Sequence, residues 1–325
     1  MIITRCPLRV SIVGGGTDLP LFSNKYVGNT TTIAINKYVY LIAHRNFNSK
    51  GVKVRYSKIE KVNDTKLIKH NIFRQVLSDN HITDVEISSV ADIRSGSGLG
   101  SSSSFTNALL AICKNLNNEN YNSRQIAYES SEVEIKKLGY EIGLQDHFST
   151  ALGGIQNLTF ESGTVKNQGI LLKKEIESEF VNSIILIDTG SRNRDEINRN
   201  QKIIQKLSRK KIDNLKKLRD LSMATSDFLN QGDIDSIGKL IARSWEIKQA
   251  THINLFTPKI KNSLNSISNL GAKSFKLLGS GKGGFILVYE RNPKIRKELI
   301  EYFNQRVLRV GIDKTGLVNL ENGML

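Results

Sequence analysis

The sequence predicts an α+β protein of two domains, a prediction that rests on length, composition and a change of pattern along the chain. The chain has 325 residues, of which 39% are hydrophobic and 24% charged, as is typical of a globular protein with a sizeable core. A domain usually has about 150 residues, so this length favours two domains. Strand-like segments dominate the first half, and long amphipathic helices dominate the second. Because the change falls near residue 180, we expect domains at residues 1–178 and 179–325.

The first half is predicted to alternate between strands and helices. Runs of β-branched, aromatic and apolar residues predict strands over Leu8–Val13, Thr30–Ala43, Lys53–Tyr56, Val85–Ile93, Ile155–Phe160 and Gly169–Leu172. Apolar residues at helical spacing predict helices over Asp64–Asn80, Ser101–Leu116 and Ser123–Gly139. A glycine-punctuated stretch, residues 143–154, separates the last of these helices from the last two strands.

The second half is predicted to be mainly helical. Apolar stripes predict helices over Asp195–Asn230 and Asp233–Ala250, after Pro258, and over Pro293–Arg306. Short apolar runs predict strands over Ile184–Ile187, Lys276–Leu278 and Phe285–Tyr289. The sequence contains no internal repeat and no low-complexity linker, so we expect the two domains to pack intimately.

The chain is basic, because 47 Lys and Arg residues outnumber 31 Asp and Glu residues and leave a net charge of +16. Such a charge attracts anions, which include nucleic acids, anionic lipids and phosphorylated small molecules. A basic run between Lys202 and Arg219 could bind nucleic acid, but it has no interleaved aromatic residues and matches no nucleic-acid motif. The run fits the solvated face of amphipathic helices better. We therefore expect no nucleic-acid partner.

Cysteine usage and hydropathy indicate the compartment. Cys6 and Cys113 show neither metal-ligand spacing nor a disulfide framework, which favours a reducing environment. The first residues reach a glycine triplet without the apolar core of a signal peptide. The longest apolar runs are far shorter than the ~20 residues of a membrane helix. We therefore expect a cytoplasmic protein without a membrane partner.

A glycine- and serine-rich loop, residues 95–104, lies between a predicted strand and a predicted helix. Glycines let the backbone approach a ligand closely, and a helix N-terminus offers unpaired N–H groups to an anion. The alternative is a flexible loop with serine caps. The loop lacks the lysine of a Walker motif. We interpret it as a phosphate cradle that binds ATP through Gly96, Ser97, Gly98, Leu99, Gly100, Ser101, Ser102 and Ser103.

Two further glycine clusters are weak signals by themselves. Gly279, Gly281 and Gly284 have the spacing of a dinucleotide-binding loop. A strand follows them where such a loop requires a helix, so a dinucleotide site is excluded. The other cluster, residues 7–18, contains Arg9, three consecutive glycines and Asp18, and alone it reads as a strand that ends in a turn.

In combination, the three clusters resemble the three ordered motifs of the GHMP kinases, over essentially the whole chain. The resemblance is greatest to the sugar and sugar-phosphate branch of that family. It rests on four segments, Gly14–Pro20, Gly143–His147, Thr189–Arg192 and Lys276–Gly279. The chain departs from the family at Arg94 and Ser95, where prolines are common, and at Ser280 and Lys282, where small residues are usual. None of these departures removes a catalytic group.

The resemblance implies a fold and a chemistry. The implied fold has a domain like the second domain of ribosomal protein S5, followed by a GHMP C-terminal α/β sandwich. The implied cofactors are ATP and Mg²⁺. Asp146 matches the catalytic base and Arg9 the basic residue that pairs with it, although Asp146 could also cap a short helix. Ser102 and Glu134, which lies 12 positions before Asp146, match the metal ligands, with Glu132 as the alternative to Glu134.

The resemblance also implies a substrate. Within the branch, the resemblance to the sugar-phosphate kinases implies phosphorylation of the anomeric hydroxyl of D-glycero-D-manno-heptose 7-phosphate, a step toward nucleotide-activated heptose for surface polysaccharide. The residues expected to bind the sugar phosphate are Asp18, Gly15, Gly16, Thr17, Gly281 and Arg192, with Arg5 and Arg194 as further candidates for its phosphate. A fucokinase or galactokinase, or a non-catalytic relative that binds sugar or nucleic acid, is the alternative. We expect a monomer or homodimer.

Overall fold

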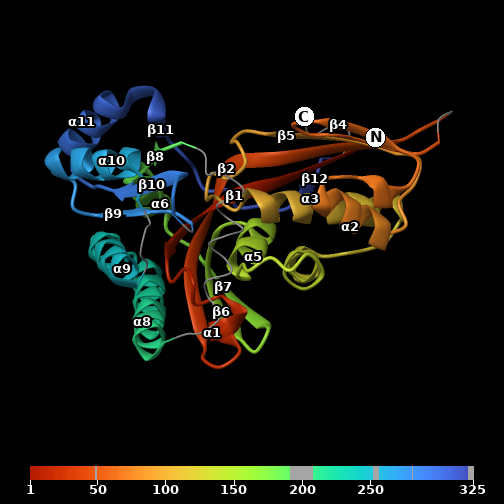
Figure 1. The fold of residues 1–325 in the computed structure, drawn as a ribbon. Helices are drawn as coiled ribbons and strands as arrows, with labels where there is room; N and C mark the ends of the chain where they lie inside the picture. The colour runs from red at the N-terminus through yellow and green to blue at the C-terminus, as the bar shows by residue number, and fades with distance from the viewer. Residues whose placement is uncertain (48–49, 191–207, 252–255, 280, 321–325) are drawn as a thin grey trace.

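Two β-sheets organise the chain in the computed structural model, which describes residues 1–47, 50–190, 208–251, 256–279 and 281–320 (Figure 1). In this described part, the first sheet has the strand order β12-β1-β2-β5-β3-β4, and β6 pairs with both β2 and β7. Its strands are β1 (Ile2–Val13), β2 (Gly28–Arg45), β3 (Val52–Arg55), β4 (Ile59–Val62), β5 (Val85–Ala91), β6 (Ile155–Glu161), β7 (Thr164–Ile170) and β12 (Val318–Asn319).

The first half of the chain also contributes the helices that belong with this sheet. They are α1 (Pro20–Ser23), α2 (Asn71–Asp79), α3 (Ser101–Leu116), α4 (Ser123–Ser131) and α5 (Gln145–Leu152). Helix α3 forms because apolar residues recur along nearly its whole length, and Leu109 and Ile112 are completely buried with residues of the sheet and of α2. Figure 1 shows α2 and α3 along one face of the sheet.

The second sheet has the order β11-β8-β10-β9 in the described residues and is built from later parts of the chain. Its strands are β8 (Ile184–Asp188), β9 (Phe275–Leu277), β10 (Phe285–Tyr289) and β11 (Val307–Leu308). Its helices are α6 (Lys174–Asn182), α8 (Arg209–Gln231), α9 (Ile237–Thr251), α10 (Pro258–Asn269) and α11 (Pro293–Phe303). Successive strand residues point to opposite faces. Ile185 and Ile187 therefore pack with α10 and α11, whereas Ile184 and Leu186 pack toward β1 and α9.

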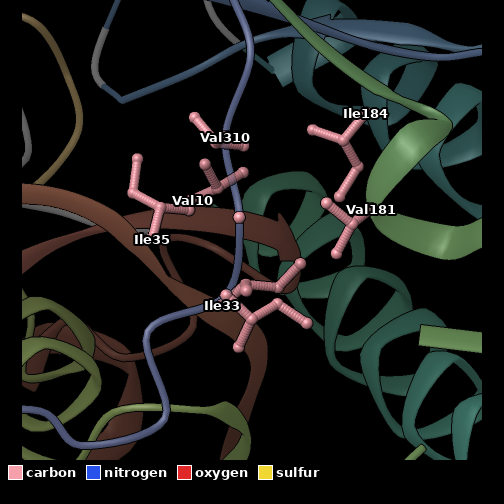
Figure 2. Close-up of a pocket in the computed structure, with 8 residues that line it drawn as sticks. Val10, Ile33, Ile35, Val181, Ile184 and Val310 are labelled. Carbon is pink, nitrogen blue, oxygen red and sulfur yellow. The ribbon is translucent and has the colours of Figure 1, made fainter. Parts of the chain in front are cut away.

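An apolar seam joins the two sheets. Figure 2 shows Val10, Ile33 and Ile35 of the first sheet facing Val181 and Ile184 across the segment around Val310. The hollow between these side chains has no room for a water molecule. It is therefore a hydrophobic contact that fixes the two halves of the chain against each other, not a ligand site.

The predicted α+β class is confirmed, and the differences from the predicted elements have local causes. The helix predicted over Asp64–Asn80 is broken, because Asp64 caps a 3₁₀ turn and α2 begins only at Asn71. The helix predicted over Ser123–Gly139 continues past α4 as a π-helical turn, Glu132–Lys137. Sequence analysis missed α6, β4, β7 as bounded here, and the short strands β11 and β12. The short helix that it offered as an alternative role for Asp146 is present as α5, but its N-cap is Leu144 and Asp146 lies in its first turn.

The domain boundary at residue 178 stays a prediction. Near the end of the described chain, β12 pairs with β1, so a segment of the second half joins the first sheet. None of the helices within the described ranges is long and apolar enough to cross a membrane. Part of the basic run lies outside the described residues, including Lys202 and Lys206. The rest lies on α8, where Lys216 covers the ring of Tyr26 and Leu215 and Leu218 are buried.

Candidate active site

Arg9 and Asp146 form the centre of the site. Arg9 lies in β1 and Asp146 in the first turn of α5. The Arg9 Nε and one terminal nitrogen donate to the two Asp146 carboxylate oxygens at 2.8 and 2.7 Å. Such a bidentate pair fixes orientation as well as charge. The Arg9 side chain is 5% exposed and that of Asp146 is 26% exposed. The buried guanidinium therefore fixes the carboxylate, which stays accessible to a ligand.

Arg9 also holds the glycine–serine loop. Its remaining terminal nitrogen donates to the Gly98 carbonyl at 2.8 Å, and its backbone N–H donates to the Leu99 carbonyl at 2.9 Å. Gly98 and Gly100 adopt φ of +79° and +75°, in the left-handed region where other residues are strained. A Cβ on Gly100 would lie 3.0 Å from Arg9 Cγ. The loop therefore packs directly on the Arg9 side chain.

The loop leads into the N-terminus of α3. The N-cap residue is Gly100, which has no side chain to satisfy the first N–H groups, so these groups are available to an anion along with the positive end of the helix. The sequence placed the phosphate cradle at residues 96–103, and the structure brings its second half onto this helix start. Ser102 is exposed there, whereas Ser103 and Ser97 are buried.

Glu134 lies behind Ser102. Its carboxylate accepts hydrogen bonds from Ser102 Oγ at 3.0 Å and from Thr106 Oγ1 at 2.6 Å. The Glu134 side chain is 1% exposed, and the basic side chain found within 4 Å of its carboxylate among the described residues is the imidazole of His147, with Nε2 at 3.6 Å. Glu134 sits in the π-helical turn, a distortion frequent at functional sites. A buried carboxylate without an Arg or Lys partner favours a cation as its ligand.

These residues fit a magnesium ion that is shared with a nucleotide. The described part of the chain holds no group of three or more His, Cys, Asp or Glu side chains suited to a metal. Magnesium usually takes one or two protein oxygens and fills its octahedron with phosphate oxygens and water. Ser102 and Glu134 would supply two oxygens of the required kind. The alternative ligand, Glu132, is exposed and pairs with Lys136.

Asp18 is held in the glycine turn after β1. It is 2% exposed, and its carboxylate accepts from the backbone N–H groups of Gly16 at 2.9 Å and Gln145 at 3.1 Å. Burial, together with repulsion from Asp146, raises the pKa of Asp18 to about 6. Since Gln145 directly precedes Asp146 in the chain, the turn and the start of α5 form one unit. Asp18 therefore lies beside the Arg9–Asp146 pair.

Four further residues predicted to bind substrate lie in the turn after β1 or in the third glycine segment. Thr17 is completely buried and ties the turn to β2, because its hydroxyl donates to the Asn29 carbonyl and accepts from the Asn29 N–H. Gly15 lies between Ser11 and Gln145, whose polar atoms would be 3.2 and 3.5 Å from a Cβ there. Gly16 adopts a φ of +99°, and Gly281 is buried.

The candidates for the substrate phosphate are only partly described. Arg192 and Arg194 lie outside the described residues. Arg5 lies toward the other end of β1, where it contacts Asp313 and Thr315 and covers the ring of Tyr38.

Sequence reasoning assigned no individual role to three residues that lie at or near the candidate site. Thr106 is one helical turn after Ser102 on α3 and shares its face, so helical spacing could have indicated it. His147 follows Asp146, and neither of its ring nitrogens has a hydrogen-bond partner in the described part. Lys276, of the third glycine segment, donates from Nζ to the Ile12 carbonyl at 2.7 Å. No local pattern indicates a contact across 264 residues.

Comparisons with known proteins identify matching families and similar relatives. Residues 66–154 match the GHMP kinases N terminal domain, and residues 224–305 match the GHMP kinases C terminal family. A D-glycero-alpha-D-manno-heptose 7-phosphate kinase of Campylobacter jejuni is 25% identical over 307 residues, with 89% of each chain covered. A galactokinase of Thermotoga maritima is 24% identical over 345 residues, with 95% of each chain covered.

The solved structures show the same fold. A D-glycero-D-manno-heptose 1-phosphate kinase from Bacteroides thetaiotaomicron matches with a TM-score of 0.80 at 20% identity, and 99% of each chain is covered. This similarity confirms the two-domain fold that the sequence predicted.

Proposed function

The chain belongs to the GHMP kinase family of ATP-dependent phosphotransferases, and from that premise we propose that it phosphorylates the anomeric hydroxyl of D-glycero-D-manno-heptose 7-phosphate. The products are the 1,7-bisphosphate and ADP. That reaction is a step toward nucleotide-activated heptose. The chain is a sugar kinase of its family, and the proposal concerns the identity of the sugar, the position phosphorylated and the residues that act.

The observation that best supports the proposal is that the Arg9 side chain binds both Asp146 and the glycine–serine loop. One side chain holds both oxygens of Asp146 and the carbonyl of Gly98 in the glycine–serine loop. A phosphoryl-transfer enzyme must bring an acceptor hydroxyl next to the terminal phosphate of its nucleotide. Here the residue suited to the hydroxyl and the loop suited to the phosphate are fixed to each other by a buried guanidinium.

The roles of the residues follow from their positions. Asp146 accepts the proton of the anomeric hydroxyl of the sugar. The oxygen of that hydroxyl bonds to the γ-phosphorus of ATP while the bond from the γ-phosphorus to the β-phosphate oxygen breaks. Arg9 stabilises the negative charge of the transferring group, and the N–H groups at the start of α3 bind the remaining phosphate oxygens. Ser102 and Glu134 would hold Mg²⁺, which would supply charge to neutralise the phosphates.

One relative and the net charge support heptose 7-phosphate as the sugar. The Campylobacter relative carries a heptose 7-phosphate kinase name and the Thermotoga relative a galactokinase name, at nearly equal identity. The net charge of +16 favours a substrate that already bears phosphate. Asp18, beside the catalytic pair, accepts sugar hydroxyls in this proposal.

The test is ADP release over a substrate panel with purified protein, ATP and Mg²⁺. The panel contains heptose 7-phosphate, unphosphorylated heptose, galactose, fucose and mevalonate, and each is repeated with Asp146→Ala. Turnover with heptose 7-phosphate alone, lost in the variant, is the expected result. Turnover with galactose or fucose instead would show that the substrate is a neutral sugar and not heptose 7-phosphate. Nucleotide binding without turnover of any substrate would contradict the kinase assignment to these sugars.

A further inference from the structure

Lys276 is a buried lysine that connects the two sheets. It lies in β9 of the second sheet and is 7% exposed. Its Nζ reaches the first sheet and donates to the Ile12 carbonyl at 2.7 Å. Ile12 is the next-to-last residue of β1, two positions before the glycine turn that carries Asp18.

The acceptor of this hydrogen bond is at an irregularity of the sheet. In the pairing of β1 with β2, Ser11 faces Thr32 and Val13 faces Thr31, so Ile12 is an extra residue between two successive pairs. Such a β-bulge leaves the extra residue outside the regular ladder and changes the direction of the strand. The Lys276 Nζ therefore satisfies a carbonyl at the point where β1 bends into the turn.

Keeping an ammonium at this place costs stability. Burial, with repulsion from Lys248 and Arg9, lowers the pKa of Lys276 well below its usual range. Lys248 is itself engaged, because its Nζ donates to the Leu277 and Gly279 carbonyls at 3.1 and 2.5 Å. An apolar side chain would avoid this cost in a region that is otherwise well packed.

We propose that Lys276 is a positioning residue that fixes the bulge at Ile12 and thereby holds Asp18 and the glycine turn in place for the sugar. The inference rests on the proposed function, since it takes the turn to bind the sugar. Lys276 belongs to the segment that precedes the third glycine loop. The second half of the chain therefore sets the geometry of a sugar site whose residues come from the first half.

The first test is independent of catalysis. Hydrogen exchange followed by mass spectrometry compares the amides of residues 12–18 in the wild-type protein with those in Lys276→Met, which lacks the donor. We expect exchange there to accelerate about tenfold, as when a hydrogen bond to a charged group is lost, and the start of α3 to exchange as before. Lys276→Arg, which keeps a charged donor, should restore most of the protection.

The matched control is Lys273→Met, the same substitution at an exposed lysine three positions earlier, which should leave exchange at residues 12–18 unchanged. Unchanged exchange in Lys276→Met would overturn the proposal, as would an equal acceleration in both variants. If Lys276→Met does not fold, Lys276→Gln, whose shorter side chain lacks the long charged donor, replaces it and is judged by the same comparison.

The second test separates the two substrates. In Lys276→Met the KM for the sugar should rise about tenfold while the KM for ATP stays within about twofold, and Lys276→Arg should recover the sugar KM. Equal increases in both KM values, or none, would refute a role in positioning the sugar turn. A wild-type protein that turns over none of the sugars would refute the proposed function alone, because the exchange experiment still tests the role of Lys276.

Discussion

Arg9 Nε and Asp146 Oδ1 lie 2.8 Å apart although 137 positions separate the two residues in the chain. The same guanidinium binds the second Asp146 oxygen and the Gly98 carbonyl, so three segments of the site meet on one side chain. Its three contacts need the planar fork of arginine, which a lysine ammonium cannot reproduce.

Arg9→Lys should therefore lower kcat by roughly 10²–10³, the usual loss when one fixed donor at a transition state is removed. The KM for ATP should change little, because the loop keeps its backbone bond from the Arg9 N–H to the Leu99 carbonyl. Steady-state kinetics measure both parameters. Arg45→Lys is the control, since Arg45 is exposed at the end of β2 and donates to the Leu116 carbonyl. Equal losses of kcat in both variants would refute the assigned role of Arg9.

Gly100→Ala should reduce kcat through Arg9. The new Cβ would be strained at a φ of +75° and would press on Arg9 Cγ from 3.0 Å. Gly139→Ala is a matched control, because Gly139 has a similar φ of +67° but nothing within 4 Å of its Cβ position. Both variants should lose about 1–2 kcal/mol of stability from backbone strain, measured by urea unfolding. Activity should fall, by at least about tenfold, only in Gly100→Ala, and a loss in Gly139→Ala as well would show that strain alone explains it.

Glu134→Gln should raise the Mg²⁺ concentration needed for half-maximal activity by at least about tenfold, since the variant removes the charged ligand of a site with few protein oxygens. Titration of Mg²⁺ at saturating ATP measures this. Glu132→Gln, on the same π-helical turn but exposed, should leave the titration unchanged. If the two effects were reversed, Glu132 would be the ligand and the buried position of Glu134 would be structural.

The raised pKa of Asp18 predicts a pH dependence of stability. Because its folded-state pKa of about 6 exceeds the ordinary value, this carboxyl contributes stability at low pH that is lost as the pH rises through 6. Relative to Asp18→Asn, which cannot ionise, the wild-type protein should lose about 1 kcal/mol of unfolding free energy between pH 5 and pH 7.5. Urea unfolding of both proteins at the two pH values measures the difference, and other titrating groups cancel in it. A wild-type protein that instead gained stability relative to the variant would show that the pKa of Asp18 is lowered.

Much of the site was predictable because its motifs are local. The cluster around Arg9, the glycine–serine loop and the segment around Asp146 each have a pattern that can be read over a few residues. The predicted metal ligands, Ser102 and Glu134, lie on separate predicted helices. The hydrogen bond between their side chains fits the role that the resemblance implies, and that role stays a prediction.

The rest depends on contacts that no local pattern contains. Helix α5 was offered only as an alternative role for Asp146, because it has only eight residues and follows a glycine-punctuated stretch, which normally predicts a loop. The π-helical turn at Glu134 was read as continuous helix, since its apolar spacing differs from that of an α-helix by a single residue. Lys276 belongs to a segment that carries the family resemblance, but no local pattern indicated that its Nζ would donate to the Ile12 carbonyl.

The central claim is phosphoryl transfer to the anomeric oxygen with Asp146 as the base. It is tested most directly by ³¹P NMR of the product made from ATP and heptose 7-phosphate by the wild-type protein and by Asp146→Asn. The account predicts a new phosphate monoester coupled to the anomeric proton beside the unchanged 7-phosphate, formed at least ~10²-fold more slowly by the variant. A new phosphate on another carbon, or equal rates for the two proteins, would contradict it.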